Sequence, residues 1–225
     1  MTTFIEILEA IGSFVLGAAG RIGIFLAAAL VLAVPALLAA LAWRALRRVP
    51  RTSLAHDARL APNHTWLAPW RRGALAIGLD EVAERILPSA TSVELPRPGM
   101  VIHRGDPVVV IRAGKRAVRV GSPVDGTVAA VNRRLGRSPG LVKEEPYGRG
   151  WLFAVAPEGE SWKELPGGLR ADSWLLGEKR RLSHFLEDEL GVAAADGGEL
   201  LAPAPALLGE EGWDRLVAEF LTKAA

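Results

Sequence analysis

The chain contains no cysteine, and this absence removes three kinds of chemistry at once. Disulfide bridges, thiolate zinc sites and cysteine nucleophiles are all excluded. Redox chemistry would therefore need an imported cofactor. Histidine is scarce, and its copies are too scattered for the close spacing of metal ligands: His56, His64, His103 and His184. We therefore expect no metal site.

Familiar catalytic motifs are missing as well. No nucleophile elbow and no phosphate-cradling glycine loop can be recognised, and a Ser-His-Asp triad could be assembled only by arbitrary choice. The net charge is only +2 at pH 7, and no aromatic platform alternates with the basic residues, which argues against nucleic-acid binding. The sequence predicts a carrier or binding protein without an active site of its own.

Hydrophobic residues make up 50% of the chain and are concentrated near the N-terminus. Residues 22–43, IGIFLAAALVLAVPALLAALAW, carry no charge and are long enough, at about 1.5 Å per residue, to cross a hydrocarbon core of roughly 30 Å. A cleaved signal peptide and a buried core helix are the alternatives. The run exceeds a signal's apolar region, and no small-residue cleavage site precedes Arg44. We therefore predict one transmembrane helix, which Pro35 should kink.

The charges that flank this run predict its orientation. Four arginines lie within residues 44–51, directly after the run, whereas Glu6, Glu9 and Arg21 precede it. The positive-inside rule then places the C-terminal side in the cytoplasm. We expect a single-pass protein of the cell membrane with its soluble part in the cytoplasm. Residues 1–21 read as an amphipathic segment that lies at the membrane interface or packs against a partner.

The rest of the chain divides into a linker, a β domain and a helical extension. Residues 44–63 are basic and contain prolines, as is typical of a linker at a membrane surface. Within residues 64–166, short apolar runs alternate with turn signals: GALAIGL, TSVEL, PVVVIRA, RAVRVGS, GTVAAVN and WLFAVAP. This alternation predicts a mainly β domain, a small antiparallel sandwich or barrel. Two short helices should interrupt it, one capped by Asp80 and one over residues 131–135.

The extension, residues 167–225, should form two helices. Asp172 or Ser173 can cap a helix that continues through WLLGEKRRLSHFLEDEL, and residues 213–221 have the pattern of a second, shorter amphipathic helix. The extension is either an added interaction surface or lid, or a simple cap on the β domain.

One predicted hairpin has a lysine at its tip, between the strands PVVVIRA and RAVRVGS. Gly114 can supply the unusual backbone angle of the turn, and Lys115 should point outward. Considered alone, a lysine in such a turn is most often a solvated surface residue.

Several separate pieces of the chain resemble the glycine cleavage system H protein: HTW, LPRPGMVIHRGD, the lysine hairpin, SPVDGTVAAVN and PYGRGWLF. Their order and spacing agree with that family from about His64 to Pro166, and PYGRGW is distinctive of it among lipoyl and biotinyl domains. The resemblance implies a flattened, lipoyl-domain-like β-barrel. Counted back from Ser122-Pro123, Lys115 falls at the family's lipoyl-lysine. This implies covalent lipoate on Lys115 and an arm that carries an aminomethyl group or electrons between partner enzymes.

The residues around Lys115 depart from the family pattern. H proteins usually have an acidic residue three positions before the lysine, where this chain has Arg112, and other basic residues lie nearby in the sequence: Arg104, Arg116, Arg119, Arg133, Arg134 and Arg137. A basic face would favour acidic partners or anionic lipid. The expected protein partners are a multi-enzyme complex or a lipoate-attaching enzyme. The alternative is an unmodified H-protein-like domain that serves as a membrane-tethered binding or assembly module.

Overall fold

The computed structural model describes residues 57–191 and 207–222. The amphipathic segment 1–21, the transmembrane helix 22–43 and most of the linker 44–63 lie outside these residues, so those predictions stay open. Among the residues described, no helix has both the length and the apolar character needed to cross a membrane.

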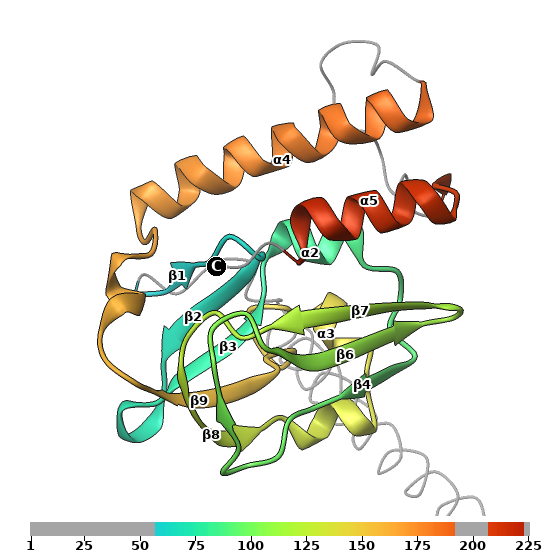
Figure 1. Cartoon of the computed structure of the whole chain (residues 1–225). Coiled ribbons are helices and arrows are strands. Elements are labelled where there is room, and N and C mark those ends of the chain that lie inside the picture. The colour runs from blue at the N-terminus through green and yellow to red at the C-terminus, as the bar shows by residue number, and fades with distance from the viewer. Residues whose placement is uncertain (1–56, 192–206, 223–225) are drawn as a thin grey trace, which may run out of the picture. The chain divides into compact units, whose positions relative to one another are not determined.

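The described residues form two antiparallel β-sheets that face each other (Figure 1). The larger sheet has the strand order β1-β2-β3-β9-β8-β5, and the smaller has the order β4-β6-β7. The strands are β1 (Arg59–Leu60), β2 (Thr65–Pro69), β3 (Leu75–Leu79), β4 (Ser92–Glu94), β5 (Val101–Ile102), β6 (Pro107–Ala113), β7 (Arg116–Gly121), β8 (Gly126–Val131) and β9 (Phe153–Pro157). This is the mainly antiparallel β architecture that the alternating sequence predicts.

Alternating side chains explain why these segments become strands. On β7, Val118 and Val120 are buried while Ala117 and Arg119 are exposed, so one face meets the core and the other meets water. The strand β3 is buried along its whole length and lies between β2 and β9 inside the larger sheet. The core between the sheets is aliphatic, with Phe153 among its largest fully buried side chains.

Short helices and turns cover the ends of the sheets: η1 (Arg71–Gly73), α2 (Glu81–Ile86), η2 (Arg133–Gly136), α3 (Leu141–Glu144) and η3 (Ser161–Glu164). The predicted cap on α2 is confirmed, because Asp80 Oδ1 accepts hydrogen bonds from the backbone N–H groups of Val82 and Ala83, at 2.9 and 3.0 Å. The short helix predicted over residues 131–135 is a 3₁₀ turn that begins two residues later.

The folded part begins earlier than His64. Arg59 and Leu60 form β1, which pairs with β2, and the Leu60 N–H donates to the Pro166 carbonyl at 2.9 Å. Ala58, Leu60 and Ala61 are buried. The end of the predicted linker is thus part of the sheet, in a strand too short for a sequence pattern to reveal.

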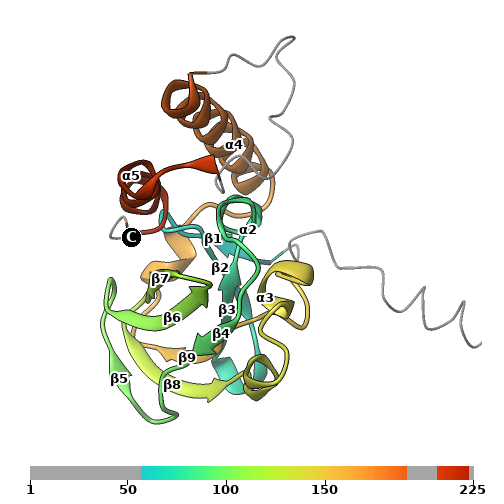
Figure 2. The ribbon, with the colours of Figure 1, turned by 90° about the vertical axis from the view of Figure 1, so that its right-hand side faces the viewer.

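Two longer helices, α4 (Leu169–Leu190) and α5 (Glu210–Phe220), lie side by side over the same end of the domain as α2 (Figures 1 and 2). The start predicted for α4 at Asp172 or Ser173 is wrong. The helix is preceded by Gly168, whose φ is 55°, and the N–H groups of Ala171 and Asp172 already bond to the Gly168 carbonyl. Asp172 instead lies in the first turn, where its carboxylate still favours the helix N-terminus.

Both long helices are attached through their apolar faces and through ion pairs. Phe220 of α5 meets Phe185 of α4 edge to face, with 5.8 Å between the ring centres. Arg181 of α4 reaches Glu219 at 3.3 Å, and Lys179 pairs with Glu81 of α2. The extension therefore packs on the β domain as a third layer rather than standing apart from it.

Candidate functional site

The candidate site is the turn that joins β6 to β7. Ala113 and Arg116 are paired across the hairpin, which leaves Gly114 and Lys115 alone in the turn. Gly114 has a φ of 62°, whereas Lys115 does not have a positive φ. A positive angle at the first central residue alone is the pattern of a type II′ turn, which continues the twist of the two strands. The turn protrudes at one end of the small sheet (Figure 1).

Lys115 is exposed and forms no hydrogen bond or ion pair with any residue that the structure describes. Its support, in contrast, is firm. The hairpin pairs in unbroken register from Ala113–Arg116 back to Val109–Val120, and β4 pairs with β6 along its other edge. The structure thus presents a primary amine on a well-anchored hairpin, where an enzyme that acylates lysine can reach it.

The arginines on either side of Lys115 are engaged by the chain itself. Arg112 donates to Glu94 of β4, with 3.0 Å between Nε and Oε1. The guanidinium group of Arg116 lies over the ring of Trp213 in α5, at 4.3 Å from the ring centre, and its Nη2 donates to the Leu208 carbonyl at 2.6 Å. The reversed charge expected from the sequence is therefore partly compensated, and α5 touches the hairpin one residue away from Lys115.

The turn at residues 122–126 anchors the base of the hairpin. Ser122 is buried and donates to the Val124 carbonyl at 2.6 Å, while Asn63 donates to the carbonyl of Gly121. Gly126 takes a φ of 153°, and a Cβ at that position would lie 2.2 Å from the carbonyl oxygen of Ala156. The positive φ and the close approach of β9 together explain why glycine is required at this position.

The PYGRGW segment has a structural role. The Tyr147 hydroxyl accepts a hydrogen bond from the Glu81 N–H at 3.0 Å, at the start of α2. Burial raises the pKa of Tyr147 well above its ordinary value, and the neighbouring Asp80 and Glu81 raise it further. Trp66 donates to the Pro146 carbonyl at 3.1 Å. The segment therefore ties α2 and β2 together.

His64 is buried and contacts both long helices. Its Nδ1 lies 2.9 Å from Asp80 Oδ2, and its ring packs between Trp174 of α4 and Phe220 of α5. These contacts give His64 a packing role. Within residues 57–191 and 207–222, no group of histidine and acidic side chains could hold a metal ion.

The predicted basic residues do not form one face. Arg133, Arg134 and Arg137 line a pocket together with Arg149, which the sequence reasoning missed. Arg104 lies elsewhere, in a turn where its backbone N–H donates to Asp125. Arg149 is brought to the other three arginines by the buried Asn132, whose side chain donates to the Arg149 carbonyl. The spacing of these residues in the sequence does not reveal this contact.

Comparison with known proteins identifies the family of this β domain. The family model of the glycine cleavage H-protein matches residues 58–171, which is half of the chain. The chain belongs to the glycine cleavage H-protein family. The resemblance found in the sequence is thereby confirmed, and α5 and most of α4 lie beyond the matched region.

Individual H proteins show the extent of the similarity. The glycine cleavage system H protein of Pseudoalteromonas atlantica is 34% identical over 123 residues, which cover 55% of this chain and 94% of that protein. The H protein of Alteromonas mediterranea is 36% identical over 118 residues, covering 52% and 90%. A crystal structure of the Mycobacterium marinum H protein is 25% identical, with a TM-score of 0.47, and covers 56% of this chain and 98% of that one.

Members of the H-protein family are lipoyl carriers that have no catalytic activity of their own, and they interact with the glycine cleavage enzymes. They carry covalently attached lipoate. The expectation that this chain has no active site of its own is therefore confirmed.

Proposed function

We propose that this H-protein family member is a lipoyl carrier whose lipoate is attached to Lys115. The observation that carries the proposal is the state of this lysine: it is exposed, forms no hydrogen bond or ion pair with the described residues, and lies in a two-residue turn where the resemblance to the family implies the lipoyl-lysine. A lipoyl arm at this point would move through solvent on a rigid base. It would also supply the sulfur atoms that the cysteine-free chain lacks.

The arm would carry an aminomethyl group or electrons between partner enzymes. The protein would position the lipoyl arm, and the partner enzymes would catalyse the reactions, because nothing in the described residues around the turn resembles a catalytic group. Partners would approach the exposed end of the hairpin, beside Arg116 and α5. The helix α5 would then form part of the surface that a partner meets.

The proposal is tested by lipoylation of the full chain in detergent with a lipoate-attaching enzyme, lipoic acid and ATP. We expect one lipoyl group per chain, located by peptide mapping on Lys115. The Lys115→Arg variant should remain unmodified, and the matched control Lys163→Arg, at another exposed lysine, should be modified as the parent is. Failure of the folded parent to accept lipoate, or modification at another lysine, would contradict the proposal.

We also propose that residues 22–43 tether this carrier to the cell membrane, with the H-protein domain in the cytoplasm. The support is the uncharged 22-residue run with arginines on its C-terminal side. The protein should remain in the membrane fraction after alkaline carbonate washing. Protease added outside intact cells or spheroplasts should leave the domain whole, and digestion of the domain there would overturn the orientation.

One observation favours a second function, that of an unmodified binding or assembly module. The contact of Arg116 with α5 gives the hairpin a neighbour that lies beyond the family match. If α5 were the recognition surface, partner capture by the full chain would persist in Lys115→Arg. In a carrier, transfer of cargo would be lost in that variant even where partners still bind.

A further inference from the structure

A second feature lies apart from the lysine hairpin, at the end of β8. Asn132, which is only 3% exposed, accepts a hydrogen bond from the Arg134 N–H at 3.3 Å and so begins the η2 turn. Its side-chain amide donates to the carbonyls of Arg149 and Trp151, both at 2.7 Å. One buried side chain thereby fixes two segments that are distant in the sequence, and both present arginines.

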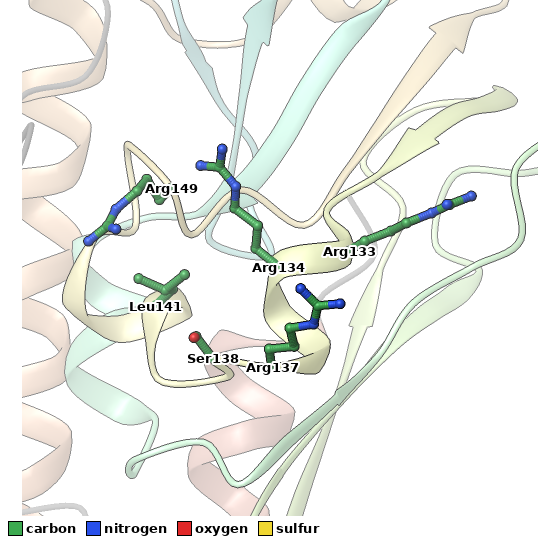
Figure 3. Close-up of a pocket in the computed structure, with 6 residues that line it drawn as sticks. All are labelled: Arg133, Arg134, Arg137, Ser138, Leu141 and Arg149. Carbon is green, nitrogen blue, oxygen red and sulfur yellow. The ribbon is translucent and has the colours of Figure 1, made fainter.

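These segments line an open surface pocket of about 520 Å³. Figure 3 shows Arg134 and Arg137 projecting from the η2 turn, with Ser138, Leu141 and Arg149 on one side and Arg133 extending on the other. Leu141 is buried and forms an apolar wall, whereas the four arginines are exposed. We name this set of six residues the arginine pocket.

Most of the positive charge of the arginine pocket is not neutralised by neighbouring carboxylates. Arg149 is held by Glu145, but no carboxylate of the described residues lies within 4.0 Å of the guanidinium groups of Arg133, Arg134 or Arg137. No acidic side chain lines the pocket. Neighbouring like charges raise each other's energy, and a bound anion would relieve this repulsion.

The arginines beside Lys115 are arranged differently. Arg112 is paired with Glu94, and Arg116 is covered by Trp213 and bonded to a carbonyl. Among the described residues, Arg133, Arg134 and Arg137 have no comparable partner, and Arg149 alone of the pocket's arginines is held by a carboxylate. The arginine pocket forms a feature separate from the proposed carrier site.

We propose that the arginine pocket binds a phosphate group. A guanidinium group offers parallel N–H donors that match the oxygens of phosphate, and a tetrahedral oxyanion can be approached by several such groups from different sides. A carboxylate, in contrast, needs only one guanidinium group to bond both of its oxygens. Ser138 adds a neutral hydroxyl donor. The pocket has no aromatic lining on which a base could stack, so recognition rests on the phosphate alone.

The phosphate can come from a soluble compound or from a phospholipid headgroup, and two probes separate these sources. The full chain is prepared in uncharged detergent micelles and titrated with inorganic phosphate, with chloride at equal ionic strength as the reference. In a parallel series the micelles contain phosphatidic acid or, as the reference, phosphatidylcholine. Amide hydrogen exchange of residues 133–149 is measured in both series, and calorimetry gives the affinity for inorganic phosphate.

We expect phosphate, phosphatidic acid or both to slow exchange in residues 133–149, and the effective probe identifies the source. The double variant R134Q/R137Q should weaken binding by about tenfold or more. R134K/R137K, which keeps the charge but loses the parallel N–H donors of the guanidinium groups, should also bind more weakly. The control R97Q/R119Q removes the same charge at exposed sites outside the pocket and should bind as the parent does. Lys115→Arg should not affect binding.

Two results would overturn the proposal. One is that neither probe slows exchange in the pocket beyond its reference. The other is that R97Q/R119Q weakens binding as much as R134Q/R137Q, which would reduce the effect to net charge. Circular dichroism should show that each variant keeps the fold, since all of the substituted side chains are exposed.

Discussion

Removing the contact between Arg116 and Trp213 tests whether α5 is bound to the lysine hairpin. The two side chains meet at 4.3 Å, and Trp213 is only 5% exposed. Trp213→Ala should cost about 3–5 kcal/mol because it leaves a large cavity between α5 and the domain. Arg116→Ala should cost about 1–3 kcal/mol, since it removes the cation–π contact and the charged hydrogen bond to Leu208.

The decisive quantity is the coupling between the two substitutions. If the residues act on each other, the double variant should lose about 1–2 kcal/mol less than the sum of the single losses. Urea unfolding of the full chain in mild detergent, followed by circular dichroism, measures each free energy of unfolding.

Arg119 provides the matched control, because it is exposed on the same strand and points away from the core. A cycle of Arg119→Ala with Trp213→Ala should be additive to within about 0.5 kcal/mol. Additivity of the Arg116 cycle to the same degree would refute the reasoning and leave α5 attached by its other contacts alone.

Three further predictions concern the elements that hold the site. Gly114→Val should destabilise by about 1–2 kcal/mol because a branched side chain resists a φ of 62°, whereas Gly114→Asn should cost less; an equal Tm for both variants would contradict this. Asp80→Ala should cost about 2–4 kcal/mol in urea unfolding, since it removes the cap of α2 and the partner of His64, and a loss below 1 kcal/mol would speak against it. Tyr147 is the chain's single tyrosine, so tyrosinate absorbance reports it alone: its midpoint should lie above pH 10 in the folded protein and near pH 10 in urea. Because the pKa of Tyr147 is raised in the folded protein, the protonated phenol contributes its full stabilisation below about pH 10, and this stabilisation is lost as the pH rises further. The Tyr147→Phe variant should not show this loss of stability at high pH.

The sequence predicted the strands that have a clear alternation of side chains. PVVVIRA became β6 with the same bounds, and RAVRVGS and GTVAAVN became β7 and β8 with one residue fewer each. β1 and β5 are two residues long and carry no such signal, because they are defined by pairing with distant strands. The lysine turn was predictable because Gly114 and Lys115 lie between two regular strands.

Contacts between distant segments could not be read in the same way. In the sequence, Arg116 is simply a basic neighbour of Lys115. Only the packing of α5 shows that Trp213 covers its guanidinium group. Likewise, Arg149 joins the arginine pocket because Asn132 bonds to its carbonyl across seventeen positions of the chain. Such pairs depend on how the layers pack, which local patterns do not specify.

The central claim is that Lys115 carries lipoate, and mass measurement of the protein from its native host tests it most directly. The intact mass should exceed that of the unmodified chain by one lipoyl group, and the peptide that contains Lys115 should carry the whole increment. Lys115→Ala expressed in the same host should lack it. An unmodified Lys115 in cells that are replete with lipoate would contradict the carrier account.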